Sequence, residues 1–328
     1  MNGGVKLKLP PLRIGDLVAQ IPIIQGGMAV KVSTAPLAAA VAEAGGIGLI
    51  AASGLNDSEL REEIKKAREL TKGIIGINIM FAVKRFVNLV EVAIQEGIDI
   101  IVTGAGFSRD IFPIGKQSKT PIVSIVSSAK LAKIAESLGA AAVVVEGKEA
   151  GGHLGTDRPA LEIVPEVREA VKIPVIAAGG ILTGKDIAKA FKLGANGVQM
   201  ATRFVLSEEC TVAPEFKQAY LEAKPEDVVI ISSPVGMPGR AIKNRFVERL
   251  FSGEELKPKE CFQCLKKCKM NFCIMKALHH GYQGNMEEGL VFSGERVGEI
   301  EDVLPVKKIM ENLVVEAEQY LDEEVIAQ

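Results

Sequence analysis

The stretch AAAVVVEGKEAGGHLG, residues 140–155, decides how the fold of this chain is interpreted. It opens with a continuous apolar run, which is typical of a parallel strand buried on both faces. The run ends at Glu146, and two adjacent glycines, Gly151 and Gly152, then lead to His153. Ligands of parallel α/β proteins bind at this carboxyl edge of the sheet, and glycines let the backbone approach a flat ligand. His153 is therefore a candidate catalytic residue, and the alternative is a histidine satisfied by loop hydrogen bonds.

Short apolar strands of this kind recur and alternate with amphipathic or Ala/Glu/Lys-rich helices. The eight predicted strands are Ile21–Gln25, Ile47–Ala52, Ile74–Met80, Ile98–Thr103, Pro121–Val126, Ala141–Glu146, Pro174–Ala178 and Gly197–Ala201. The predicted helices between them include Thr34–Ala44, Ser58–Thr71, Phe86–Glu96, Ala129–Leu138, Val164–Val171 and Gly184–Leu193. This alternation predicts an α/β fold, a (β/α)8 TIM barrel, in preference to an open doubly wound sheet.

The composition narrows the class of protein and its partners. The chain has 328 residues, of which 48% are hydrophobic, so it can form a sizeable core. Its 39 basic and 41 acidic residues give a net charge of -2, which argues against nucleic acid or an anionic membrane as a partner. The first residues, MNGGVKLKLPPLRIGDL, lack a signal-peptide core, and no run reaches the roughly 18 apolar residues of a membrane span. We expect a soluble cytoplasmic protein.

The strand–helix pattern stops after Phe204, which predicts a smaller second lobe. Residues 1–207 are expected to form the barrel. Residues 208–295 are expected to form a helical lobe over the C-terminal face of the barrel, close to the substrate. Residues 296–328 are expected to contain a final amphipathic helix, from Val306 to about Tyr320, that returns to the barrel.

The ends of the last two predicted strands suggest a phosphate site. Gly179 and Gly180 follow one strand and precede a helix beginning near Lys185, and Thr202 follows the other strand. In barrels these two loops commonly bind phosphate through backbone N–H groups and a helix N-terminus. Gly180 allows close approach and Thr202 adds a hydroxyl donor. The alternative is that the glycines only form tight turns.

A phosphate-bearing ligand across the barrel mouth would meet polar groups and glycines at the other strand ends. The candidates to face it are Gln25, Asn78 and Glu146 at its polar edge and Gly26, Gly27 and Met28 against its flat face. His153 would then lie near its reactive part. This arrangement suits flavin mononucleotide (FMN), and no dinucleotide fingerprint is present.

Four of the five cysteines lie within 13 residues of each other, in a segment with metal-ligand spacing. The candidate ligands are Cys261, Cys264, Cys268 and Cys273. If the segment is helical, the first three share a face, and the fourth can close a tetrahedral site for zinc or an iron–sulfur cluster. The alternative is four reduced thiols, since no partnering cysteine pair occurs elsewhere. His279 and His280 are either further ligands or surface residues, and Cys210 is an ordinary thiol.

Several motifs together resemble the 2-nitropropane dioxygenase family of FMN-dependent barrels, which includes nitronate monooxygenases and flavin-dependent enoyl-acyl-carrier-protein reductases. They are QGGM at Gln25, GINIM at Gly76, TGAG at Thr103, EGKEAGGHLG at Glu146, IPVIAAGGI at Ile173 and VQMATRF at Val198. The resemblance covers Ile21 to Phe204 in order and extends to Arg240–Asn244. It implies a fold of the barrel type already predicted from the strand pattern.

The resemblance also implies roles for matching residues. The implied FMN contacts are Gly26, Gly27, Met28, Asn78, Glu146, Gly151, Gly180, Gln199, Met200, Ala201 and Thr202, with Gly179 in the phosphate loop. His153 falls at the catalytic histidine of the family. The cofactor that the resemblance implies is FMN.

The favoured activity is that of a nitronate monooxygenase, in which O2 re-oxidises the flavin. The alternative is an enoyl-acyl-carrier-protein reductase, with NAD(P)H as reductant, an enoyl thioester as substrate and acyl carrier protein as partner. Glu146 and Arg240–Asn244 favour the reductases, whereas the cysteine-bearing lobe departs from them. Arg240 and Lys243 either hold an anionic substrate group or pin the lobe to the barrel. A homodimer is a further expectation, and a barrel that binds a phosphorylated ligand without redox chemistry is the non-redox alternative.

Overall fold

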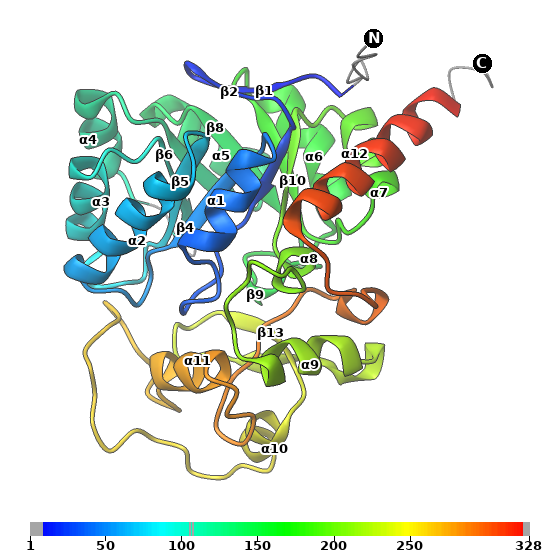
Figure 1. The fold of residues 1–328 in the computed structure, drawn as a ribbon. Coiled ribbons are helices and arrows are strands. Elements are labelled where there is room, and N and C mark those ends of the chain that lie inside the picture. Colours follow the sequence, from blue (N-terminus) through cyan, green and yellow to red (C-terminus); the bar gives the residue numbers. More distant parts are fainter. Residues whose placement is uncertain (1–8, 105, 107, 324–328) are drawn as a thin grey trace.

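The computed structural model describes residues 9–104, 106 and 108–323, and its main body is a closed parallel barrel (Figure 1). The hydrogen-bonded order is β10-β11-β3-β4-β5-β6-β7-β8. The barrel strands are β3 Ile23–Gln25, β4 Ile47–Ala51, β5 Ile74–Met80, β6 Ile100–Gly104, β7 Ile122–Val126, β8 Ala142–Glu146, β10 Val175–Ala178 and β11 Gly197–Met200. The predicted barrel and all of its strands are therefore confirmed. Ala105 of the TGAG motif lies outside the described residues.

Helices on the outside of the barrel follow the strands. They are α1 Ala35–Glu43, α2 Asp57–Leu70, α3 Phe86–Gln95, α4 Ile111–Ser118, α5 Ala129–Leu138, α6 Ala160–Ala170 and α7 Gly184–Lys192. The sequence interpretation missed α4, because Pro113 and Gly115 are poor helix formers. It also began α6 too late, because Pro165 lies inside that helix.

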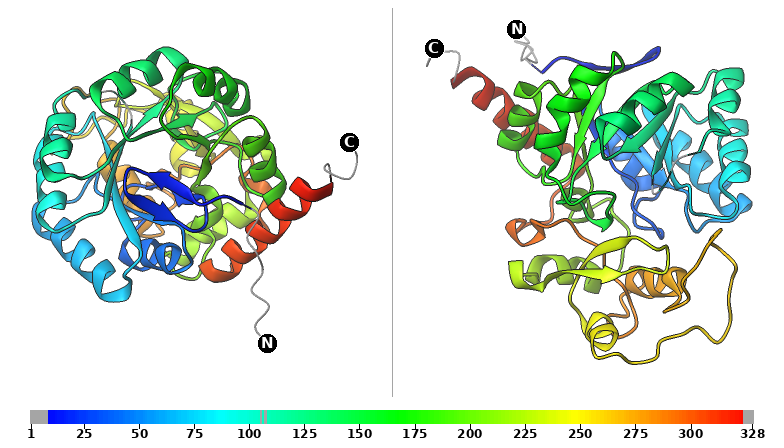
Figure 2. Two further views of the ribbon diagram at one scale, coloured as in Figure 1. Left: turned by 90° about the horizontal axis from the view of Figure 1, so that it is seen from above. Right: turned by 180° about the vertical axis from the view of Figure 1, so that it is seen from behind.

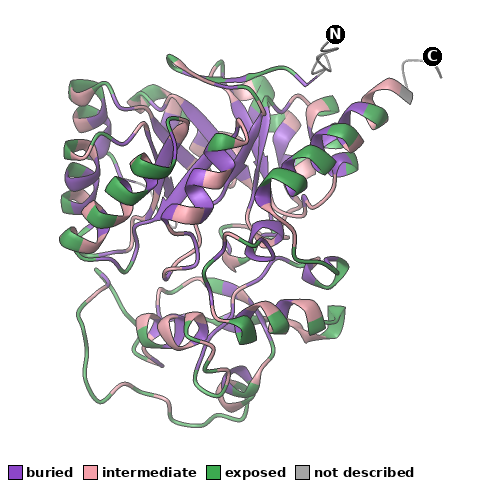
Figure 3. Ribbon diagram, in the orientation of Figure 1, coloured by how far each residue is buried: buried purple, intermediate pink, exposed green. Residues whose placement is uncertain are grey.

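Side chains of β8 alternate between the barrel interior and the helical layer. Ala142 and Val144 pack inside the barrel, whereas Val143 and Val145 pack against the helices. A hairpin of β1 Leu12–Ile14 and β2 Leu17–Ala19 covers the opposite end of the barrel from the second lobe (Figure 2). Because the alternation has a period of two, the next inward position at the open end is Glu146. The buried strands form the centre of Figure 3.

The place of the eighth barrel helix is shared by two segments. After β11, α8 Thr202–Val205 is only one turn long. The final helix, α12 Val306–Glu323, packs against α7 and α1 (Figure 1). The predicted return of the C-terminal helix to the barrel is thus observed over its described residues. Each helix in the described part of the chain is too short or too polar to cross a membrane.

The second lobe lies against the carboxyl ends of the barrel strands (Figures 1 and 2). Its elements are the helices α9 Pro214–Glu222, α10 Arg245–Phe251 and α11 Ile274–Tyr282, the short turns η1 Pro225–Asp227 and η2 Val297–Glu299, and the strands β12 Val228–Ser232 and β13 Pro238–Ile242. The lobe was expected to be helical, and it contains three helices together with two strands that were not predicted. β12 and β13 form an antiparallel sheet with β9, the pair Gly152–His153 of the barrel loop. The β-branched run of β12, VVIIS, was the overlooked signal.

Candidate active site

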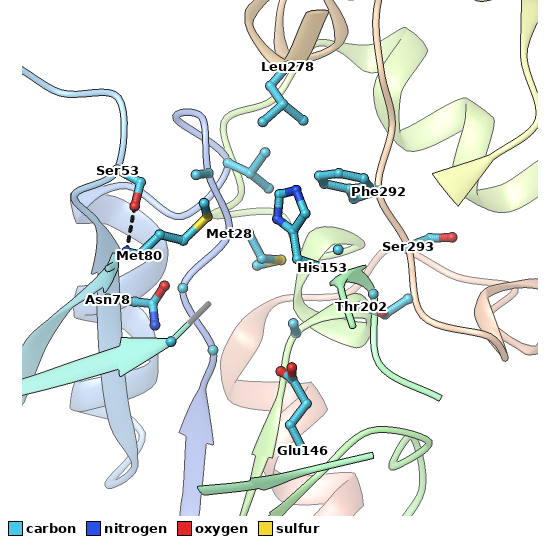
Figure 4. A pocket seen from close by; sticks show the side chains of 18 of the residues that line it. Met28, Ser53, Asn78, Met80, Glu146, His153, Thr202, Leu278, Phe292 and Ser293 are labelled. Atoms are coloured by element: carbon cyan, nitrogen blue, oxygen red, sulfur yellow. Dashed lines mark hydrogen bonds between the residues drawn. The ribbon is translucent and has the colours of Figure 1, made fainter. Parts of the chain in front are cut away.

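A pocket lies between the barrel mouth and the second lobe (Figure 4). Ten of the residues that the sequence singles out line it, namely Gly26, Gly27, Met28, Asn78, Glu146, Gly151, His153, Gln199, Ala201 and Thr202. They come from the ends of β3, β5, β8 and β11 and from the loops that follow these strands. The barrel thus gathers groups that lie up to 176 positions apart in the sequence, from 26 to 202.

A smaller pocket continues from the first one and shares with it Glu146, Gly151, Gln199, Ala201 and Thr202. It adds three further predicted contacts, Gly179, Gly180 and Met200. The two pockets together form a chamber with a side arm at the ends of β10 and β11. This shape matches a ligand with a flat ring system and a phosphate tail.

Three glycines line the chamber at positions where the backbone lies close to neighbouring residues. A Cβ atom on Gly27 would lie 2.2 Å from Cβ of Asn78, and one on Gly26 would lie 3.3 Å from Cγ of Gln199. A Cβ on Gly151 would lie 2.6 Å from the backbone of Ser293. A side chain at Gly27 or Gly151 would force its neighbours to move, whereas the contact at Gly26 is only tight, so these glycines keep space free where a planar ring would rest.

The side arm contains hydroxyl and guanidinium donors. Gly179 and Gly180 have positive φ angles of 99° and 70°, which turn the backbone around the arm. Thr202 Oγ1 accepts a hydrogen bond from Gly294 N at 2.9 Å, so its own proton remains for a ligand. Arg296, also in the lining, donates to the Gly180 carbonyl at 2.6 Å. Arg296 was not predicted, because it lies far along the chain and belongs to no recognisable motif.

The first turn of α7 was expected to supply N–H groups to the phosphate, but two of its amides already have protein partners. Gly184 N donates to Glu316 Oε2 of α12 at 2.7 Å. Asp186 N donates to Thr183 Oγ1, and Asp186 in turn accepts from the N–H groups of Leu182 and Thr183. The bonds between Thr183 and Asp186 form the capping box of the helix. The other groups that could hold a phosphate at this arm are the glycine turn, Thr202 and Arg296.

The half-buried Glu146 and two buried polar atoms lie in the lining of the chamber. Burial raises the pKa of the Glu146 carboxyl to about 7. Gln199 Oε1 and Ser293 Oγ are buried, and neither has a hydrogen-bond partner in the described structure. Unpaired buried polar atoms are rare in proteins, so their position in a pocket lining fits a polar ligand edge. Gln25 was expected here too. It lines neither pocket, because its amide accepts from Leu49 N and donates to the Gly26 carbonyl.

His153 lies in the lining of the chamber, beside Phe292 of the second lobe (Figure 4). Its Nε2 lies 2.7 Å from Ser233 Oγ, and its ring packs edge-on against Phe292 at a centroid distance of 5.2 Å. Burial lowers the pKa of His153 to about 4, so the imidazole is neutral near pH 7. Ser233 and Phe292 were missed, because the pairing of β9 with β13 cannot be seen in a strand of only two residues.

The outer part of the chamber is apolar and comes mainly from the second lobe. Its lining there includes Phe216, Tyr220, Leu278, Leu290 and Phe292. Among the described residues, no lysine or arginine lines the first pocket.

The two basic residues suggested as substrate contacts lie elsewhere. Arg240 donates to the carbonyls of Lys148 and Ala150, at 2.6 Å and 3.2 Å, and so joins β13 to the barrel loop. Lys243 is exposed, and it lines neither of the two pockets. These hydrogen bonds favour the suggestion that Arg240 pins the lobe to the barrel.

The cysteine segment is not helical, so the condition under which its first three cysteines would share a face is not met. Cys261 and Cys268 are exposed, Cys264 and Cys273 are half-buried, and all of them are free thiols. Within the described chain, no three Cys, His, Asp or Glu side chains are arranged to hold a metal ion. The segment is irregular because its backbone bonds to other loops. The Cys264 carbonyl accepts from Lys84 N, and Lys269 N donates to the Pro234 carbonyl. His280 pairs with Glu288 rather than with a thiol.

A closed (β/α)8 barrel with a glycine-lined ring site and a phosphate arm after its last two strands defines the class of FMN-binding barrel enzymes. The residues present fit this cofactor, since the glycines leave room for its ring and Arg296 and Thr202 lie at the phosphate arm. The sequence model of the family described as nitronate monooxygenase matches residues 12–316. The chain belongs to this family, and it is a flavin-dependent oxidoreductase.

Individual relatives share this fold and much of the sequence. A curated (3aS,4S,5R,7aS)-5-hydroxy-7a-methyl-1-oxo-octahydro-1H-indene-4-carboxyl-CoA dehydrogenase of Mycobacterium tuberculosis is 30% identical, and the match covers 92% of this chain and 94% of the relative. A probable nitronate monooxygenase of Staphylococcus aureus is 29% identical over 71% of this chain and 78% of its own. The structure of FabK from Thermotoga maritima superposes with a TM-score of 0.83 and 33% identity, covering 94% of this chain and 96% of the other.

Proposed function

We propose that this chain is an FMN-dependent nitronate monooxygenase that oxidises a small alkyl nitronate with O2. The observation that carries the proposal is the single neutral imidazole of His153, which faces the chamber beside apolar side chains. A nitronate has already lost its acidic proton, so its oxidation requires no strong base. A histidine whose pKa is held near 4 is a weak base but remains a good hydrogen-bond donor.

Each part of the site has a task in this proposal. Gly26, Gly27 and Asn78 would hold the flavin ring, and Arg296 with Thr202 would hold its phosphate. Bound FMN supplies the two-electron redox chemistry, and O2 restores its oxidised form. His153 orients the nitro group and exchanges no proton with the substrate carbon. The apolar outer chamber receives the alkyl chain and excludes water from the reacting atoms.

The second candidate is reduction of an enoyl thioester by NAD(P)H, with a coenzyme A or acyl-carrier-protein thioester as substrate. The apolar chamber and the absence of a lysine or arginine from the described lining of the first pocket favour a neutral acyl chain. The relative named as a CoA dehydrogenase matches over 92% of this chain, which supports a thioester. Here His153 would donate a hydrogen bond to the thioester carbonyl. A homodimer remains a prediction for either activity, and sedimentation of the purified protein checks it.

Steady-state turnover tests the first candidate. The holoenzyme should consume O2 and release nitrite with a propyl nitronate, without added NADH or NADPH. His153→Gln keeps the size of the side chain and should retain FMN, while kcat falls by about 100-fold. Normal turnover of that variant would remove His153 from the mechanism. Lack of any nitronate-dependent O2 uptake by the wild-type holoenzyme would remove the activity itself.

A further inference from the structure

Ser233 is a buried residue that the proposed activity does not yet use. It follows β12 and opens the turn to β13, where its N–H donates to the Met237 carbonyl at 3.2 Å. Its side chain is 0% exposed. The strand β13 also pairs with β9, so that Gly239 lies opposite His153. The two pairings together bring the Ser233 hydroxyl to the imidazole, at 2.7 Å from Nε2.

The hydrogen bonds around this hydroxyl decide where its proton lies. Ser233 Oγ already accepts the N–H of Val235 at 3.3 Å. A hydroxyl has one proton to donate, and in a fully buried place that proton needs an acceptor. Within the described chain the acceptor in contact is His153 Nε2. If Nε2 carried a proton instead, two donors would point at Oγ and the Ser233 proton would have no partner.

The imidazole cannot easily turn away from this bond. Phe292 packs edge-on against the ring at an interplanar angle of 71°. The Phe292 carbonyl accepts from the buried hydroxyl of Tyr220, and Ala241 of β13 forms a β-bridge with Phe292. The ring therefore lies in a slot made by the same sheet that supplies Ser233. With Nε2 engaged there, Nδ1 is the ring nitrogen available to a ligand in the chamber (Figure 4).

We infer that Ser233 is a positioning residue that holds His153 as its Nδ1–H tautomer, so that the ring presents an N–H donor to an oxygen atom of the substrate. Ser233 itself does not touch the substrate. The identity of that oxygen rests on the proposed function and is a nitro oxygen for a nitronate. The tautomer does not depend on which substrate binds.

The turn that carries Ser233 is braced by the cysteine segment. Asn271 Nδ2 donates to the Ser232 carbonyl, and Lys269 N donates to the Pro234 carbonyl, both at 2.9 Å. These bonds flank Ser233 on either side. The segment from 269 to 271 therefore fixes the turn from the outside of the lobe, while His153 contacts its inner side.

Nitrogen NMR of the holoenzyme tests the tautomer directly. The chain has three histidines, so 15N-histidine labelling gives few signals, and His153→Gln identifies those of His153. At pH 7 we expect a protonated Nδ1 and an unprotonated Nε2 at His153. The measurement can tell the two apart, because protonated and unprotonated ring nitrogens have well-separated 15N chemical shifts. A protonated Nε2 or a charged ring would overturn the inference. Activity could then still be present, and conversely a correct tautomer without nitronate turnover would refute only the proposed function.

Variants of Ser233 test whether the tautomer matters. Ser233→Ala should retain FMN, show a mixture of tautomers and lose about 10- to 100-fold in kcat, with KM changed less than about twofold. Ser233→Thr keeps the hydroxyl and should restore the single tautomer and part of kcat. Ser232→Ala, at the exposed neighbouring side chain, is the matched control and should behave as wild type. An alanine variant with unchanged tautomer and unchanged kcat would show that Ser233 has no such role.

Discussion

Gly27 and Asn78 approach so closely that a Cβ atom on Gly27 would lie 2.2 Å from Cβ of Asn78. Gly27 follows β3 and Asn78 lies in β5, so the two residues come from strands that are separated by β4 in the barrel. Any side chain at 27 must push Asn78 or the backbone toward the ring site.

Gly27→Ala should therefore abolish stoichiometric FMN binding, as measured by the flavin absorbance per polypeptide. Gly155→Ala lies in the His153 loop, but its Cβ would make an ordinary 3.5 Å contact with Ser127. This control should bind FMN as wild type does. Full flavin content in Gly27→Ala would mean that the ring does not rest on this glycine.

Arg296 should be the main cationic contact of the FMN phosphate. Its guanidinium donates to the Gly180 carbonyl at 2.6 Å, to Asp186 Oδ2 at 2.8 Å and to both carboxylate oxygens of Glu299, so it is held in place at the arm with one N–H left for a ligand. Removing a charge-assisted contact to phosphate costs about tenfold or more in affinity. We expect this loss in Arg296→Ala by titration of the apoprotein with FMN. Arg245→Ala, at an exposed arginine of α10, should leave the affinity unchanged. Equal affinities for both variants would place the phosphate elsewhere.

Glu146 should make the FMN-free protein less stable at higher pH. Its pKa is raised by burial to about 7, above the value near 4.5 of a free glutamate. The folded state therefore holds a proton that the unfolded state releases, and stability falls as pH rises between these two values. Glu146→Gln removes this slope, so its Tm should exceed that of wild type by about 2–4 °C at pH 8 and by less at pH 5. Glu162→Gln, at an exposed site on α6, is the control. A Tm difference between Glu146→Gln and wild type that does not change with pH would contradict the raised pKa of Glu146.

The cysteine segment should show the reactivity of free thiols. The exposed thiols of Cys261 and Cys268 should react rapidly with an aromatic disulfide reagent. Cys264 should react more slowly, because burial and the electrostatic influence of the neighbouring Cys273 raise its pKa. Cys210 is buried with a raised pKa and should react only after unfolding. Protection of all four clustered thiols, lifted by a chelator, would instead support the metal that their spacing predicts.

The sequence was most informative where a regular pattern of apolar residues determines the secondary structure. Apolar runs ending in Gly or a polar residue located every barrel strand, and the residues after them became the chamber lining. What could not be predicted depends on contacts between distant segments. The partner of His153 arises because β13 pairs with a two-residue strand, and Arg296 reaches the phosphate arm from beyond the second lobe. The first turn of α7 looked like an anion site, but the amides of Gly184 and Asp186 in that turn donate to Glu316 and Thr183.

Anaerobic mixing of the holoenzyme with substrate tests the central claim most directly. The flavin absorbance should bleach when a propyl nitronate is added in the absence of O2, and it should return when O2 is admitted. NADH and NADPH should leave the spectrum unchanged over the same time. Bleaching by NADH or NADPH, with no response to the nitronate, would contradict the account and assign the site to thioester reduction.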